Sequence, residues 1–222
     1  MPPVDWDLAA RSLGPIVLGA VRGTVPLAIV SFAAGMLVAV GVALARLSRH
    51  RVLSGAGRAY VSVIRGTPLL VQLFVVFYGL PSLGLVIDPW PSAIIAFSLN
   101  VGGYGAEIVR AAILSVPKGQ WEAAHVIGMS HRQSLTRIVL PQAARVSVPP
   151  LSNTFIALVK DTSLASLILV TELFRRAQQV AAFSQQFMLL YLEAALVYWV
   201  ICLVLSAGQG RLEKRLDRYV AH

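Results

Sequence analysis

The chain has 222 residues, of which 57% are hydrophobic and only 13% are charged. A soluble domain carries about 25% charged residues, and a globule of this size could not bury so much apolar surface. The net charge of +9 suggests either a nucleic-acid partner or the basic cytoplasmic loops of a membrane protein. The composition excludes disorder, collagen-like repeats and most soluble enzymes, and it indicates an integral membrane protein.

Five stretches are long and apolar enough to be predicted as membrane-spanning helices. The first is too long for a signal-peptide core and follows an acidic segment, so we expect a retained helix rather than a cleaved signal. Polar or charged residues interrupt the last three stretches. The five predicted spans are residues 25–45, 67–87, 91–114, 148–170 and 187–207.

Basic residues are distributed unevenly among the segments that connect the predicted spans. Most of the 19 lysines and arginines lie in residues 46–65, 110–145 and 211–218. Because basic residues accumulate in cytoplasmic loops, this pattern predicts an outside N-terminus and a cytoplasmic C-terminus. It also explains the high net charge without nucleic acid, although Arg175 and Arg176 do not fit it.

The long inner loop, residues 115–145, is predicted to hold two short helices. Residues 122–124 open the first helix and Gly128 ends it, while Ser130 caps the second and Pro141 ends it. Two short helices with an apolar face suit insertion into a groove on a partner protein. They are equally compatible with an amphipathic helix that lies on lipid.

The same loop resembles the signature loop of bacterial ATP-binding-cassette (ABC) importer permeases. The motif Glu-Ala-Ala, three residues, Gly, nine residues and Ile-x-Leu-Pro is complete in this sequence. Its residues are Glu122, Ala123, Ala124, Gly128, Ile138, Leu140 and Pro141. In that family the loop is the coupling helix that docks into the ATPase subunit, which implies this role for the residues from Glu122 to Gly128.

Further motifs are similar to the polar amino acid branch of this family, and within it to the bacterial L-cystine permeases. They lie at residues 65–69, 118–120, 140–143 and 160–164, and the likeness extends over residues 20–210. The resemblance implies an all-α permease in which residues 1–222 form one transmembrane domain with five spans. The implied substrate is L-cystine or a related polar amino acid.

The resemblance also implies an assembly in the cytoplasmic membrane of a bacterium. Its other members are a second permease subunit (identical or different), an ABC ATPase and an extracytoplasmic solute-binding protein. ATP and Mg²⁺ belong to the ATPase, because this chain lacks the Gly-x-x-x-x-Gly-Lys-Ser/Thr loop that cradles phosphates. We therefore expect no catalytic residue, metal or cofactor on this chain.

Polar residues near the middle of the predicted spans are the candidate substrate contacts, because a zwitterion crosses a bilayer only where polar groups replace its water. Asn100 and Asp161 lie near the midplane at a rise of about 1.5 Å per residue. Asp161 could accept from a substrate ammonium, and Asn100 could serve either charged end. Gln72 is a third candidate. Alternatively, Asp161 pairs with a cation on another helix and only holds the bundle together.

Other features of the spans are interpreted as structural. Glu107 and Arg110 have the spacing of an ion pair on one helix face, and Glu193 is expected to reach the outer interface. Breaks at residues 102–105 or 149–150 could expose backbone groups to the charged ends of a substrate.

Two alternatives to the importer come from other classes of protein. An ion-coupled secondary transporter or channel would use Glu107, Asp161 and Glu193 as a relay. A membrane anchor or signalling subunit would have no role in transport.

Overall fold

The computed structural model describes residues 6–217, and these residues are almost entirely helical, with no strand among them. The first five residues and Arg218, the end of the last basic cluster, lie outside the described residues. Three helices are long and apolar enough to cross a membrane alone, and two bent helix pairs raise the number to five if each crosses once. The five predicted spans thus correspond to three continuous helices and two broken ones.

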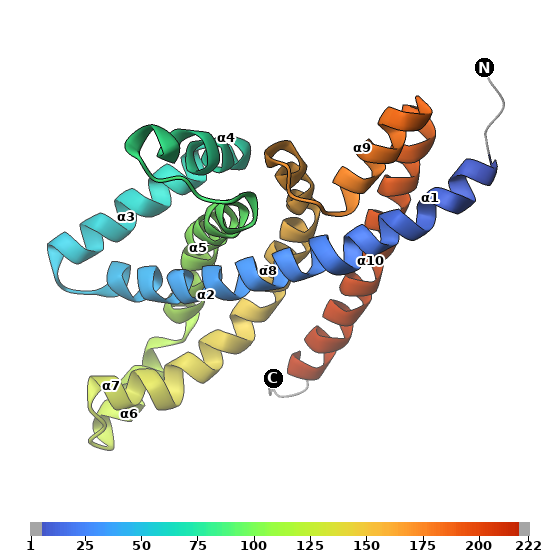
Figure 1. The fold of residues 1–222 in the computed structure, drawn as a ribbon. Coiled ribbons are helices and arrows are strands. Elements are labelled where there is room, and N and C mark those ends of the chain that lie inside the picture. Colours follow the sequence, from blue (N-terminus) through green and yellow to red (C-terminus); the bar gives the residue numbers. More distant parts are fainter. Residues whose placement is uncertain (1–5, 218–222) are drawn as a thin grey trace.

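Ten α-helices form this part of the chain, and five short π- or 3-10-helical turns connect or extend them (Figure 1). The α-helices are α1 (Trp6–Gly19), α2 (Val25–Leu47), α3 (Arg51–Gly66), α4 (Leu69–Phe74), α5 (Pro89–Ser115), α6 (Lys118–Val126), α7 (His131–Ser134), α8 (Leu140–Asp161), α9 (Leu173–Ser184) and α10 (Phe187–Asp217). The turns are η1 (Ala20–Thr24), η2 (Val75–Gly79), η3 (Leu80–Leu83), η4 (Leu135–Val139) and η5 (Thr162–Ile168).

The first span is longer than the hydropathy pattern predicts. The π-helical turn η1 joins α1 to α2, and together they form one helical rod of 42 residues, drawn in blue in Figure 1. Arg22 bounds the predicted span, but its side chain is exposed and does not interrupt the helix. The rod therefore begins at Trp6, well before the predicted start at residue 25.

The second span is broken, and its predicted bounds, residues 67–87, are wrong. The segment assigned to an inner loop contains α3, whose buried face includes Val61 and Ile64, while its arginines lie on the exposed side. The following helical segment is bent by 106° from α3. Pro68 causes the break, because it disfavours helical backbone at Thr67, which is extended at φ −122° and ψ 146°.

The fourth span also differs from its predicted bounds. Pro141 does not end a helix: it lies in the first turn of α8, and the backbone before it stays helical. The π-helical turn η4 joins α7 to α8. The regular α-helix ends at Asp161 and continues as the 3-10 turn η5, before a bend of 48° leads into α9. The prolines at 149–150 lie inside α8 without ending it.

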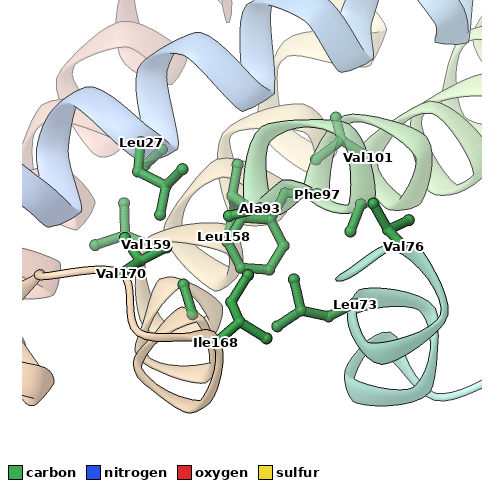
Figure 2. Packing of buried hydrophobic residues seen from close by; sticks show 13 residues of the cluster. Leu27, Leu73, Val76, Ala93, Phe97, Val101, Leu158, Val159, Ile168 and Val170 are labelled. Atoms are coloured by element: carbon green, nitrogen blue, oxygen red, sulfur yellow. The ribbon is translucent and has the colours of Figure 1, made fainter. Parts of the chain in front are cut away.

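The largest apolar core lies where α2, α4, α5, α8 and η5 meet. Figure 2 shows Phe97 of α5 at its centre, with Leu158 of α8, Leu73 of α4 and Ile168 of η5 around the ring. All four side chains are buried. This cluster packs the two broken spans against α5, and close contacts between its side chains stabilise that arrangement.

The glycines of α5 serve close packing, and the predicted helix break at residues 102–105 does not occur. A Cβ atom on Gly102 would lie 2.7 Å from Tyr60 Oη, and one on Gly103 would lie 2.5 Å from Ile64 Cγ2. Small residues let helix backbones approach closely in membrane proteins. Both glycines therefore bring α3 against α5.

We expect Gly35→Ala in α2 to destabilise the protein by about 1–3 kcal/mol through overpacking. A Cβ atom there would lie 2.6 Å from Val101 Cβ and 2.9 Å from the Ser98 carbonyl oxygen. Gly41→Ala is the matched control, because a Cβ atom at this position in the same helix meets no atom within 4 Å. Thermal unfolding of both purified variants tests this, and equal melting temperatures would contradict the packing of α2 on α5.

Candidate functional site

A cavity of about 300 Å³ lies among the break between α3 and α4, the middle of α5 and the end of α8. Two of the three predicted substrate contacts, Asn100 and Asp161, lie on its wall. The lining residues are Thr67, Pro68, Leu69, Asn100, Val101, Tyr104, Thr154, Ala157, Leu158 and Asp161. The structure thus brings one carboxylate, one amide and three hydroxyl groups to a common space.

In both broken spans, the helix before the break ends at this cavity. Thr67 follows the last residue of α3, and Asp161 is the last residue of α8. Broken helices in transporters present backbone groups to the charged ends of substrates. The structure places such breaks beside the cavity, after α3 and after α8. The sequence predicts them elsewhere, at residues 102–105 or 149–150.

Gln72 does not line the cavity, but it forms hydrogen bonds with two residues that do, Thr67 and Asn100. Its Nε2 donates to the Ile64 carbonyl oxygen at 2.7 Å and to the Thr67 carbonyl oxygen at 3.1 Å. Its Oε1 accepts from Asn100 Nδ2 at 3.1 Å. Gln72 therefore satisfies carbonyl groups at the end of α3 and orients the Asn100 amide.

Asp161 is partly buried, whereas its neighbour Lys160 is exposed. Their side chains thus lie on different sides of α8, as their adjacency predicts. No ion pair among residues 6–217 includes Asp161. The alternative in which Asp161 pairs with a cation on another helix has no support in this part of the chain.

The inner loop forms two helical segments, α6 and then α7, as predicted, although α6 begins at Lys118 rather than at residue 122. Gly128 ends this first helix in the left-handed region, at φ +78°. Ser130 caps α7: its hydroxyl accepts from Gln133 N at 3.3 Å, and Gln133 Oε1 accepts from Ser130 N at 2.8 Å. This reciprocal pair is a capping box.

One side of the inner loop is apolar and uncovered. Val126 and Ile127 are 85% and 74% exposed, and Glu122 and Ala123 beside them are exposed as well. Ala124 is 1% exposed and faces the protein. Figure 1 shows α6 and α7 projecting at one end of the molecule, so these exposed residues can contact a partner.

The loop packs against the ends of the two helices that carry Asn100 and Asp161. A small apolar cluster, which includes Ile113 of α5, Val139 of η4 and Ala143 of α8, packs against Trp121 of α6. The Trp121 and His131 rings stack with their centroids 5.1 Å apart. The loop is therefore in contact with both α5 and α8.

Glu107 forms the predicted ion pair with Arg110 and a second one, which sequence reasoning missed, with Arg46 of α2. Arg46 follows the uncharged stretch of the first span, so its sequence position suggests only a loop cation. The pair with Arg46 links α2 to the second half of α5, whereas the pair with Arg110 lies within α5.

Glu172 was not predicted, and it is the most deeply buried acid among the described residues, with no exposed surface. Its Oε1 accepts from Arg175 N at 2.6 Å, and its Oε2 accepts from Phe174 N at 2.8 Å and Tyr198 Oη at 2.8 Å. Thr24 Oγ1 donates to the same Oε2 at 3.4 Å. The carboxylate therefore caps α9 and joins it to η1 and α10.

Glu193 lies on α10 and accepts a hydrogen bond from Ser12 Oγ of α1 at 2.6 Å. Its bonding partner therefore differs from those of Glu107, and neither acid is hydrogen-bonded to Asp161. Among the described residues, no hydrogen bond or ion pair joins these three acids directly.

Comparison with known proteins identifies the family. Residues 31–218 match the family "binding-protein-dependent transport system inner membrane component". The L-cystine transport system permease protein TcyB of Bacillus subtilis (strain 168) is 58% identical over 98% of this chain and 94% of its own length. The nopaline transport system permease protein NocM of Agrobacterium fabrum is 40% identical over 91% of this chain and 88% of its own.

Solved structures agree with this result. The crystal structure of an amino acid ABC transporter with histidines contains a chain with a TM-score of 0.91 and 31% identity, covering 96% of this chain and 99% of that one. The inward-facing MetNI methionine ABC transporter shares the fold, with a TM-score of 0.70 and 19% identity over 97% of this chain and 99% of that chain. This chain belongs to the family of binding-protein-dependent inner membrane components and is a multi-pass permease subunit of an ABC importer.

Proposed function

We propose that this chain forms half of a membrane pathway for L-cystine or a related polar amino acid. The observation that carries the proposal is the cavity that Asn100 and Asp161 line together from α5 and α8. A carboxylate can accept from a substrate ammonium, and an amide can serve either charged end. The identity of 58% with a permease named for L-cystine supports this choice of substrate.

The connection between cavity and coupling loop supports an ATP-driven mechanism. The helix α5, which carries Asn100, ends at Ser115, and α6 begins at Lys118. The chain then continues through α7 and η4 into α8, which ends at Asp161. An ATPase that moves α6 therefore moves both walls of the cavity.

The proposed assembly contains two permease subunits, identical or different, an ABC ATPase pair and an extracytoplasmic solute-binding protein. In this arrangement α6 and the turn after it dock into the ATPase through the exposed residues Glu122, Ala123 and Gly128. Ala124 of the same motif is buried against this chain, so it supports α6 instead of contacting the ATPase. ATP and Mg²⁺ bind to the ATPase, and this chain acts without a cofactor and without hydrolysing ATP itself.

The orientation that we propose has the N-terminus outside and the C-terminus in the cytoplasm. Figure 1 supports it, because α1 begins at the side of the molecule opposite to α6 and α7, while α10 ends toward their side. Docking of α6 to a cytoplasmic ATPase then sets the orientation of every span. The basic residues Arg46, Arg49 and Arg51 and those at 110–145 agree with it.

Transport then proceeds by alternating access. ATP binding closes the ATPase pair, brings the coupling helices together and opens the cavity outward, where the binding protein releases its amino acid. Hydrolysis and product release restore the inward-facing state. The substrate alone can shift this equilibrium only by its difference in affinity for the two states.

Uptake of radiolabelled L-cystine tests the proposal, in proteoliposomes that contain the complete complex and its binding protein. We expect Asp161→Asn and Asn100→Ala to lower uptake at least about tenfold, since a hydrogen bond to a charged group contributes about 1.5–3 kcal/mol. The control is Asn153→Ala, an exposed amide on α8 that bonds Gln209 instead.

Unchanged uptake in both cavity variants would contradict the assignment of the cavity. Competition by another amino acid without L-cystine uptake would change the substrate and retain the mechanism. Uptake that continues without the ATPase, driven by an ion gradient, would favour a secondary transporter instead.

A further inference from the structure

The cavity wall provides one charged group, whereas a free amino acid carries two. Asp161 is its single acid, and no lysine or arginine is among the ten described residues that line it. A substrate carboxylate that left water without a cationic partner would cross the protein at a high cost. A cation close to this wall would remove that cost.

Arg65 is such a cation. It belongs to the motif at residues 65–69, which is neither part of the coupling loop nor the source of Asn100 or Asp161. It lies in the last turn of α3, two residues before Thr67 of the cavity wall. Its guanidinium carbon lies 5.4 Å from the centroid of the Tyr104 ring, within the range of a cation–π interaction. Tyr104 itself lines the cavity.

The guanidinium of Arg65 is held in place but retains its capacity to bind an anion. Its side chain is exposed, and no ion pair within residues 6–217 includes it. A cation–π contact uses none of the N–H groups of the guanidinium, so they remain able to donate. Those N–H groups form a planar fork that matches a carboxylate in a bidentate manner.

We propose that Arg65 binds the α-carboxylate of the substrate while Asp161 accepts from its ammonium, and that the Tyr104 ring positions the guanidinium. This inference rests on the proposed function of the cavity. It makes Arg65 a determinant of specificity: the pathway would select substrates that carry a free carboxylate beside an ammonium group.

Direct binding to the purified permease–ATPase complex, without the binding protein, tests this role of Arg65. Radiolabelled L-cystine and L-cystine dimethyl ester, which lacks the free carboxylates, are the two probes. We expect the wild type to prefer the free acid. Arg65→Gln should weaken binding of the free acid at least about tenfold and leave binding of the ester unchanged, so that the preference disappears.

Three further variants separate recognition from folding. Arg65→Lys retains the charge without the fork and should give a smaller loss. Tyr104→Phe retains the ring and should keep the preference for the free acid even if the lost hydroxyl changes the affinity for both probes, whereas Tyr104→Leu should lose part of that preference. Lys160→Gln removes the exposed cation beside Asp161 and should retain that preference.

Several outcomes would overturn the inference. In Arg65→Gln, binding of both probes could weaken equally, or binding of neither could weaken. The wild type could also bind the ester and the free acid with the same affinity. If the preference for the free acid disappears in Lys160→Gln instead, the carboxylate site is at Lys160. A wild-type complex that binds neither probe would refute the cavity function itself and this inference with it. That result differs from the others because in each of them the wild type still binds at least one probe.

Discussion

Replacement of Glu172 by alanine is expected to lower the free energy of unfolding by roughly 3 kcal/mol or more, since each buried donor left without an acceptor costs about 1–3 kcal/mol. The change removes the acceptor of two backbone N–H groups, at Phe174 and Arg175, and of the Tyr198 hydroxyl. All three donors would remain in a site where Glu172 has no exposed surface. For a chain of this length the loss corresponds to a decrease in melting temperature on the order of 10 °C.

The chain provides its own probe for this measurement. Cys202 is the single cysteine, and it lies partly buried in α10. A thiol-reactive fluorescent dye should therefore report unfolding as the purified protein is heated. Tyr198→Phe removes one of the hydrogen bonds and should give a smaller decrease. Glu213→Ala is the control, because this acid lies near the end of α10 and accepts a hydrogen bond only from Gln209.

Equal melting temperatures for the wild type and Glu172→Ala would show that the carboxylate does not hold α9 against η1 and α10. Gly23 of the first span provides a second test of the contact between η1 and the start of α9. A Cβ atom on Gly23 would lie 2.5 Å from Glu172 Cα, so Gly23→Ala should be destabilising as well. Both results together would establish that the contact between α1–η1 and α9 depends on close backbone approach and on one buried acid.

Reversal of the charge at Glu122 is expected to abolish uptake and to weaken assembly with the ATPase. Glu122 is exposed on α6, close to the uncovered Val126 and Ile127. A charge reversal at the centre of a protein interface costs several kcal/mol, because it places like charges together or leaves a partner charge without its counterpart. We therefore expect Glu122→Arg to reduce both ATPase co-purification and L-cystine uptake at least about tenfold.

The matched control for Glu122→Arg is Thr136→Arg. It places the same arginine side chain at an exposed position of the inner loop, on η4 rather than on α6, and leaves Glu122 in place. Melting temperatures of both variants should stay near that of the wild type, because neither side chain is buried. Normal co-purification and normal uptake in Glu122→Arg would contradict the docking of α6 to the ATPase.

Features that depend on local sequence were predicted correctly. The uncharged run at residues 25–45 and the apolar runs at 91–114 and 187–207 are helices, because hydropathy over about 20 residues is sufficient to indicate a span. The ends of the two loop helices at Gly128 and Ser130 are also local, since each depends on one backbone conformation or one pair of side chains.

The breaks in the second and fourth spans illustrate what local patterns miss. Pro141 and Pro68 have the same backbone constraint, yet Pro141 begins α8 within a nearly continuous helical segment and Pro68 accompanies a bend of 106°. The two prolines differ in the hydrogen-bond partners that the neighbouring residues offer to the backbone. Gln72 satisfies the carbonyl groups that the bend releases at Ile64 and Thr67, and it is eight residues away from the first of them.

Hydropathy, caps and the loop motif were enough to determine from the sequence that this is an all-helical membrane permease with a coupling loop and polar residues in its spans. Only the tertiary structure decided that Asn100 and Asp161 line one cavity, that Gln72 stands behind it and that Glu172 joins three elements. The reason is physical. A span or a cap is stabilised by neighbours within a few turns, whereas a cavity or a buried carboxylate depends on groups brought together from distant helices, such as Thr24 and Tyr198 around Glu172.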